Sequence, residues 1–230
     1  MRYTLFIANK NYSSWSLRPW LLLRELGIAF TEELVPFHEA ARWRDFRRIS
    51  PNGKVPCLID GGTTVWESLA IVEYLAERHA GVWPTAAAAR AWGRSAAAEM
   101  HAGFGALRNQ CSMNCGVRVR LHAVPGDLND DLQRLSVLWN DGLARFGGPY
   151  LAGAAFTAVD AFFAPVVLRL QTYGLTLGAA ADGYSARMLQ RPALREWYVA
   201  GLAEPWRDLP HDAVSARYGE VLQDLRAPQA

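Results

Sequence analysis

The order of short apolar segments near the start of this 230-residue chain constrains its fold more than any other feature. Residues 3–8 are apolar and bounded by polar residues, and residues 30–35 alternate weakly, which predicts two strands. The leucine-rich segment between them ends at Gly27, so a helix with a glycine C-cap is expected there. This order forms a βαβ unit with parallel strands. The loop that enters the helix then lies at the carboxyl edge of the sheet, where ligands bind in open α/β folds.

That loop carries three serines, Ser13, Ser14 and Ser16, shortly before Pro19. Proline has no N–H and is best tolerated in the first turn of a helix, so the helix is expected to start near Ser16. Ser13 and Ser14 would then lie at a helix N-terminus, where unpaired N–H groups and the helix dipole favour an anion. The simpler interpretation is that one serine is only an N-cap.

Turn residues divide the next part of the chain into short elements. Ser50-Pro51-Asn52-Gly53 is a dense turn signal, and Asp60-Gly61-Gly62 separates two extended segments as in a hairpin. The expected elements are a helix over 42–49, strands over 54–59 and 63–66, and a helix over 67–79. The first domain, residues 1–80, is therefore predicted to have the element order βαβαββα.

The remainder of the chain is predicted to be an all-helical domain over residues 86–230. Residues 81–85, which include Gly81 and Pro84, are the best linker candidate. No strand is expected beyond them. Helices are expected over 86–108, over 128–146, over 160–173 with a kink at Pro165, and over 192–203.

Composition narrows the classes of function. Hydrophobic residues make up 51% and charged residues 20% of the chain, which is typical of a soluble globular protein. A net charge of +2 with both signs mixed gives no argument for a nucleic-acid or membrane partner, and no run is long enough to cross a bilayer. The basic cluster Arg42, Arg44, Arg47 and Arg48 is interpreted as a solvated helix face. Three cysteines and the lack of a signal-peptide core favour a cytoplasmic protein.

No metal site is expected. Cys111, Cys115 and His122 are the candidate ligands that lie closest in sequence. Their spacing fits no tetrahedral zinc pattern. Cys57, in a predicted strand, is interpreted as a small core residue.

Three motifs and their spacing resemble those of the cytosolic glutathione transferases. They are Ser13-Ser14-Trp15-Ser16, Gly53-Lys54-Val55-Pro56 and Glu67-Ser68-Leu69-Ala70-Ile71. The resemblance implies a thioredoxin-like first domain and a helical second domain. The segment Phe156–Asp160 also matches the family's capping motif, in which Thr157 and Asp160 cap a helix reciprocally.

The serine stretch is similar to that of bacterial serine-type members and of the zeta class in particular. This chain has Trp15 where the zeta class has a cysteine. Thiol-transferase chemistry is therefore not expected. The choice of hydroxyl stays open, because Tyr12 is a possible donor in place of the serines, as in tyrosine-type classes.

The resemblance implies that glutathione is the co-substrate and that a serine stabilises its thiolate. Ser13 is the first choice, Ser14 the second, and Ser16 is better suited to capping. A free thiol with a pKa of about 8.5 is only a few per cent ionised at neutral pH. A hydrogen bond to a charged group contributes about 1.5–3 kcal/mol, so one hydroxyl at a helix N-terminus can lower the pKa by about one to two units.

The other two motifs are expected to hold the rest of the tripeptide. Val55 precedes a proline and is therefore extended, so its N–H and C=O can pair with glutathione as an added strand. In the family the bond before Pro56 is cis. Glu67 and Ser68 suit the γ-glutamyl end, because a carboxylate meets its amine while the hydroxyl and helix N–H groups meet its carboxylate. Lys54 is the residue that the family places near the glycine carboxylate.

A second substrate is expected between the domains, against the first long helix of the second domain. Met100, Phe104 and Leu107 recur at helical spacing, with His101 and Arg108 beside them. Together they are predicted to form an apolar wall with a polar edge.

The resulting hypothesis is a homodimeric glutathione transferase that conjugates glutathione to a small hydrophobic electrophile. One alternative is a glutathione-dependent cis–trans isomerase of the maleylacetoacetate type, in which the thiolate adds, a bond rotates and the thiol leaves. The other is a non-catalytic binding protein with the same fold.

Overall fold

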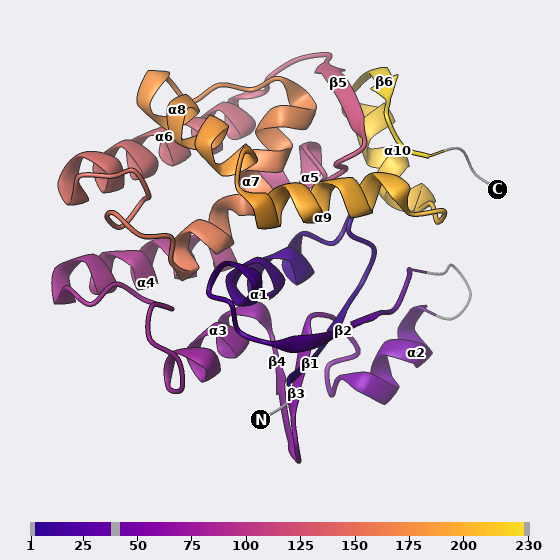
Figure 1. Ribbon diagram of the computed structural model, residues 1–230. Helices are drawn as coiled ribbons and strands as arrows, with labels where there is room; N and C mark the ends of the chain where they lie inside the picture. The colour runs from indigo at the N-terminus through magenta and orange to yellow at the C-terminus, as the bar shows by residue number, and fades with distance from the viewer. Residues whose placement is uncertain (1–2, 38–41, 228–230) are drawn as a thin grey trace.

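The computed structural model describes residues 3–37 and 42–227 (Figure 1). The first domain has the predicted order βαβαββα. Its elements are β1 (Tyr3–Ile7), α1 (Ser14–Glu25), β2 (Phe30–Leu34), α2 (Arg42–Ile49), β3 (Cys57–Asp60), β4 (Thr63–Trp66) and α3 (Ser68–Ala76). The basic cluster predicted over 42–48 lies on α2, but its first two arginine side chains are outside the described part of the structure.

A four-stranded mixed sheet with strand order β2-β1-β3-β4 forms the base of this domain. β1 pairs in parallel with β2, with Leu5 opposite Glu32, and antiparallel with β3, with Leu5 opposite Leu58. Tyr3, Leu5 and Ile7 alternate as buried residues along β1 and face the core. Since β1 and β2 are parallel, the loop after β1 emerges at the carboxyl edge of the sheet, as predicted.

Helix α1 begins at Ser14, earlier than the predicted start near Ser16, and this places Pro19 inside the helix rather than in its first turn. The prediction was wrong because it relied on the cost of an internal proline, which is about 3 kcal/mol. That cost is offset by packing. Leu17, Trp20 and Leu21 are fully buried, and α1 lies between the sheet and the helices of the second domain.

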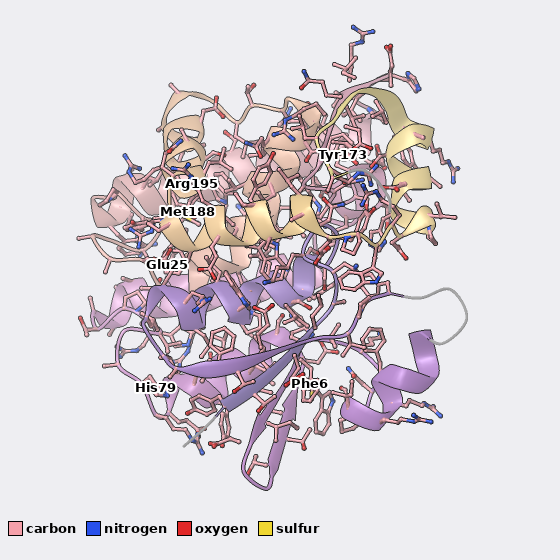
Figure 2. All side chains as sticks on the ribbon, turned by 45° about the vertical axis from the view of Figure 1, so that its right-hand side comes forward. Phe6, Glu25, His79, Tyr173, Met188 and Arg195 are labelled. Carbon is pink, nitrogen blue, oxygen red and sulfur yellow. The ribbon has the colours of Figure 1, made fainter. Side chains whose placement is uncertain are left out.

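The second domain is mainly helical, as predicted. Its helices are α4 (Ala87–Ala102), α5 (Gly105–Gln110), α6 (Gly126–Phe146), α7 (Ala158–Tyr173), α8 (Ala179–Leu189), α9 (Pro192–Ala203) and α10 (Leu209–Tyr218). In Figure 1, α9 runs alongside α1, and Figure 2 shows Glu25 at this boundary between the domains. The Glu25 carboxylate accepts a hydrogen bond from Nε of Arg191 at 3.1 Å.

Two features of this domain differ from the sequence prediction. A two-stranded antiparallel sheet joins β5 (Val117–Leu121) to β6 (Gly219–Asp224), where no strand was expected. The helix predicted over 86–108 is also interrupted, since Phe104 has a left-handed backbone with φ of 59° between α4 and α5. This break changes the direction in which the residues after Ala102 point.

Helix α7 is the centre of the second domain, and its N-terminus has the predicted capping box. Oδ2 of Asp160 accepts the Thr157 N–H at 2.9 Å, while Oδ1 accepts the Leu151 N–H at 3.0 Å and the Tyr184 hydroxyl at 3.1 Å. Asp160 is completely buried. Burial raises the pKa of Asp160 to about 6, although these donors act in the opposite direction.

Glu204, the residue after α9, links the second domain to the start of the serine loop through hydrogen bonds. Its carboxylate accepts the Lys10 N–H at 2.6 Å and the Asn11 N–H at 3.3 Å. Burial raises the pKa of Glu204 to about 7, while these two donors and the Lys10 charge lower it. The ionised carboxylate is thus less stable in the folded chain than in the unfolded one.

We therefore expect a pH-dependent stability to which Glu204 contributes. Because its pKa is 4.5 unfolded and about 7 folded, the folded chain binds more protons, and stability falls as the pH rises through this window. The loss is on the order of 3 kcal/mol. Urea denaturation between about pH 5 and about pH 8 measures it. Glu204→Gln, which does not titrate, should lose less stability over this range, and an identical pH dependence in both proteins would contradict this assignment.

Candidate active site

Two adjoining cavities open at the carboxyl edge of the sheet, where the second domain meets it. The larger one has a volume of about 600 Å³ and the smaller one about 310 Å³. Trp15, Lys54 and Val55 line both, so the two cavities form a single bipartite site. Residues from the predicted motifs form one side, and residues from α5, α7 and α10 form the other.

The serine loop borders the larger cavity. Ser13 is the N-cap of α1 but makes no side-chain capping bond. Its hydroxyl donates instead to Oγ of Ser16 at 2.7 Å, and Ser16 Oγ also accepts the Ala8 N–H at 3.2 Å. Ser16 is fully buried, and its hydroxyl does not cap α1, in contrast to the prediction. Ser14 also lines the cavity, and its hydroxyl bonds to no atom in the described part of the chain.

The Tyr12 hydroxyl forms hydrogen bonds with residues near the C-terminal end of the chain. It donates to Oδ1 of Asp212 at 3.2 Å and accepts from Nη1 of Arg226 at 2.7 Å. Burial and the Asp212 carboxylate raise the pKa of Tyr12. Tyr12 lines the cavity, but its hydroxyl holds the C-terminal segment in place.

The second and third motifs meet in the smaller cavity, as their resemblance to the glutathione transferases implied. The Val55–Pro56 bond is cis, as that resemblance also implied. Glu67, the residue before α3, has a φ of 71°, which is rare for a residue with a side chain. Its Oε1 accepts a hydrogen bond from Nδ2 of Asn52 at 2.9 Å, so Asn52 orients this carboxylate. Sequence reasoning had treated Asn52 only as a turn residue.

Ser68 and Lys54 lie differently around this cavity. Lys54 is exposed and lines both cavities. Ser68 is the first residue of α3 and is fully buried, and its hydroxyl accepts from Nη1 of Arg18 at 3.4 Å. The Ser68 side chain therefore lies behind the cavity wall, and its hydroxyl supports Arg18.

The four residues predicted to bind the second substrate do not lie together. Met100 is fully buried and Phe104 is 6% exposed, and both belong to the core rather than to either cavity. His101 lines the smaller cavity, while Arg108 lines the larger one. The predicted stripe assumed one continuous helix, and the break at Phe104 separates its members.

Trp15 forms the wall between the two cavities. The guanidinium carbons of Arg18 and Arg108 lie 4.2 Å and 4.8 Å from the centre of its ring, within cation–π range. The His101 ring meets the same indole edge-on, with 5.1 Å between centroids. Burial and the nearby charges of Arg108 and Arg169 lower the pKa of Arg18 well below its usual range. Trp15 thus occupies the cysteine position of the zeta class with a large ring held among cations.

Several cavity residues were not anticipated from the sequence. They are Phe37, Phe46, Asn109, Ser112, Met113, Arg169 and His211. His211 comes from α10 and stacks on Phe37 with 5.8 Å between ring centroids. Arg169 had a detectable signal, since it is one of only two charged residues in α7, which is mostly apolar.

None of the three cysteines is among the residues that line the two cavities. Cys57, Cys111 and Cys115 are buried and unpaired, and burial raises the pKa of Cys111 and of Cys115 to about 12. Across residues 3–37 and 42–227 no cluster of three or more His, Cys, Asp or Glu side chains is arranged to hold a metal ion. Among the described helices, none is both long and apolar enough to span a membrane.

The mixed four-stranded sheet, the docked helical domain and the cavity at the start of α1 define a thioredoxin-like fold with a helical second domain. The family description "Glutathione S-transferase, N-terminal domain" matches residues 12–78, and "Glutathione S-transferase, C-terminal domain" matches residues 76–200. The chain belongs to the glutathione S-transferase family.

Solved structures share this fold over most of the chain. A glutathione transferase homologue from Burkholderia, solved with bound glutathione, is 21% identical and has a TM-score of 0.65, covering 87% of this chain and 98% of that one. A theta-class glutathione S-transferase from Xanthomonas axonopodis pv. citri, also with glutathione bound, is 26% identical with a TM-score of 0.63. That match covers 85% of this chain and 96% of that one.

Curated relatives match in two ways. The dichloromethane dehalogenase of Methylophilus leisingeri is 44% identical over 59 residues, which cover 24% of this chain and 21% of that protein. The match to that relative therefore spans only about a fifth of its length. The glutathione S-transferase-like protein OpS6 of Beauveria bassiana is 24% identical over 84% of this chain and 92% of its own length.

Proposed function

We propose that this protein is a serine-type glutathione transferase, in which glutathione lies across the two cavities with its thiol at the serine loop. The observation that carries the proposal is the convergence of Ser13, Val55 and Glu67 on one bipartite site. A thiolate would attack an electrophilic carbon in the larger cavity. The new C–S bond forms as the leaving group departs with its electron pair, and the thiol proton is released to water.

Ser13 is the proposed donor to the thiolate, and Ser16 is proposed to position it. A hydroxyl carries one hydrogen, which rotates between acceptors, and two lone pairs. When Ser13 turns its hydrogen to the thiolate, Ser16 can donate to Ser13 in return, because their oxygens are 2.7 Å apart. The chain Ala8 N–H, Ser16 and Ser13 then points at the sulfur, and its members polarise one another. No heavy atom has to move.

The peptide part of glutathione is proposed to lie along the smaller cavity. Val55 provides the backbone edge for the cysteinyl residue. Glu67, held by Asn52, is placed for the γ-glutamyl amine, and Lys54 for the glycine carboxylate. These assignments use the same residues that the sequence motifs indicated.

Calorimetric titration of glutathione and a small turnover panel test this function. The panel contains a dihalomethane, a chlorodinitrobenzene, an epoxide and maleylacetone. Binding with turnover of the first three supports the transferase, whereas turnover of maleylacetone alone supports the isomerase. Binding without any turnover would support the non-catalytic alternative, and no binding would contradict both the transferase and the isomerase.

Tyr12→Phe is expected to leave kcat/KM within about twofold, because the Tyr12 hydroxyl already bonds to Asp212 and Arg226. The variant should instead lose about 1–2 kcal/mol of unfolding free energy, since the partly buried Arg226 and Asp212 groups lose a partner. Steady-state kinetics and urea denaturation measure the two effects. A tenfold or larger loss of kcat/KM would make Tyr12 the thiolate donor instead.

We also propose that the protein is a cytoplasmic homodimer, as the family resemblance and the cysteine usage suggest. Sedimentation equilibrium of the full chain tests the oligomeric state. A monomer at micromolar concentration would contradict this proposal without affecting the proposed chemistry.

A further inference from the structure

Three cationic side chains line the larger cavity. Lys54, Arg108 and Arg169 line it together with His211, and no Asp or Glu belongs to its wall among the described residues. Its apolar wall comes from rings such as Trp15. A cavity meant only for neutral hydrophobic molecules has no need of two arginines from different helices.

Arg169 is the more informative of the two, because it is only 4% exposed. It projects from the middle of α7, where its Nε donates to the Cys111 carbonyl at 2.8 Å and its Nη1 to the Pro165 carbonyl at 3.3 Å. Its Nη2 donates to no atom in the described part of the chain. Burial and the neighbouring Arg108 lower the pKa of Arg169 to about 10, which leaves it charged at neutral pH.

Arg108 faces the same cavity from α5. Its Nε donates to the Gly103 carbonyl at 2.8 Å and its Nη2 to the Met100 carbonyl, while Nη1 has no partner among the described residues. Asp131 is the acid whose charge acts on Arg108, and it lies outside the cavity wall, bonded to the Leu107 N–H. Backbone carbonyls therefore fix both guanidinium groups, and neither one forms an ion pair with a carboxylate of the described residues.

Two like charges held close together in a partly desolvated site are unfavourable unless an anion joins them. The glycine carboxylate of glutathione has Lys54 as its proposed partner, and the γ-glutamyl end is proposed to lie beside Glu67 in the smaller cavity. The one free Nη atom on each of Arg108 and Arg169 offers a charged N–H donor of the kind that suits a carboxylate oxygen.

We propose that Arg108 and Arg169 form an anion site for the second substrate, which carries a carboxylate beside its electrophilic carbon on an aromatic or unsaturated frame. This inference rests on the proposed function in calling the bound anion a substrate, but the anion site itself does not require turnover. It deepens the sequence hypothesis, because the second substrate is anionic rather than simply hydrophobic.

Equilibrium binding of two matched probes tests the site without catalysis. Dinitrobenzoate and dinitrobenzamide, with nitro groups at the same ring positions, differ in charge but share the same ring and nitro substituents. Quenching of tryptophan fluorescence, with calorimetry as a check, gives both dissociation constants. We expect the acid to bind at least tenfold more tightly than the amide, and equal or reversed affinities would overturn the proposal.

Variants assign that preference to the two arginines. Arg108→Gln and Arg169→Gln should each weaken binding of the acid at least tenfold and change binding of the amide less than twofold. Arg195→Gln removes an exposed charge from α9, away from this cavity, and should change neither. If Arg169→Gln fails to fold, the comparison of the two probes on the unmodified chain still decides the proposal.

A final experiment tests whether this anion site is distinct from the glutathione site. The titrations are repeated with saturating S-methylglutathione, which has no thiolate. Retained acid binding supports a separate site, whereas competition would show that the arginines serve glutathione and would overturn the proposal. Acid preference in a protein that binds no glutathione would leave the anion site standing and contradict the proposed transferase.

Discussion

Replacing Ser13 with alanine is expected to lower kcat/KM about 10- to 100-fold near neutral pH. Ser13 is the only donor that the proposal gives to the thiolate, and its loss should raise the pKa of bound glutathione by about one to two units. Well below that pKa, each unit removes about nine-tenths of the thiolate. The pH profile of kcat/KM measures this directly. The two proteins should converge above about pH 9, where the thiol ionises unaided.

Matched serine variants make this result specific. Ser16→Ala should have a smaller effect in the same direction, because it removes the group that holds Ser13 but not the donor itself. Ser95→Ala on α4 is the control, since its exposed hydroxyl bonds only to the Ala91 carbonyl. A full loss in Ser14→Ala with none in Ser13→Ala would transfer the role to Ser14.

Asp160→Ala is expected to lower the free energy of unfolding by about 3–5 kcal/mol. The change leaves the Leu151 and Thr157 N–H groups and the Tyr184 hydroxyl without their buried acceptor, and each unsatisfied group costs about 1–3 kcal/mol. It also removes half of the capping box of α7. Urea denaturation monitored by circular dichroism measures the loss.

Asp130→Ala is the control for this experiment, because Asp130 is exposed on α6 and should change stability by less than about 0.5 kcal/mol. Asp160→Asn keeps one acceptor oxygen and should lie between the two. A loss below about 1 kcal/mol in Asp160→Ala would mean that the buried donors find other partners and that the capping box is not essential.

The first domain could be predicted well because its signals are local. Periodicity and turn residues gave β1, α2 and the β3–β4 hairpin within a few residues. The start of α1 could not be predicted from local signals. Burial on two sides stabilises α1 despite Pro19, and that packing depends on residues far away in the chain.

The second domain was predicted less completely because its missed features depend on distant partners. β5 alternates as Val-Arg-Val-Arg-Leu, a strand pattern, but its partner β6 lies about a hundred residues later, and no local signal joins them. The break at Phe104 has no proline to mark it, and the flanking Gly103 and Gly105 are a local signal that the prediction overlooked. As a result, the predicted stripe of Met100 and Phe104 was assigned to a cavity that it does not reach.

The residues of the candidate site likewise differ in how far the sequence could predict them. Ser13, Val55 and Glu67 belong to short motifs, so the sequence alone indicated them. Arg169 was missed, although a buried helix with two charges invites the question of what each one does. Asp160 forms the cap, and Arg169 faces the cavity.

The central claim is that the serine loop stabilises a bound thiolate, and ultraviolet titration of glutathione bound to the unmodified protein tests it most directly. Thiolate absorbance is followed against pH with the protein saturated, and Ser13→Ala is titrated in parallel. We expect a pKa about one to two units below the free value of about 8.5 in the unmodified protein, and a return toward that value in the variant. Bound glutathione with an unshifted pKa in the unmodified protein would contradict it.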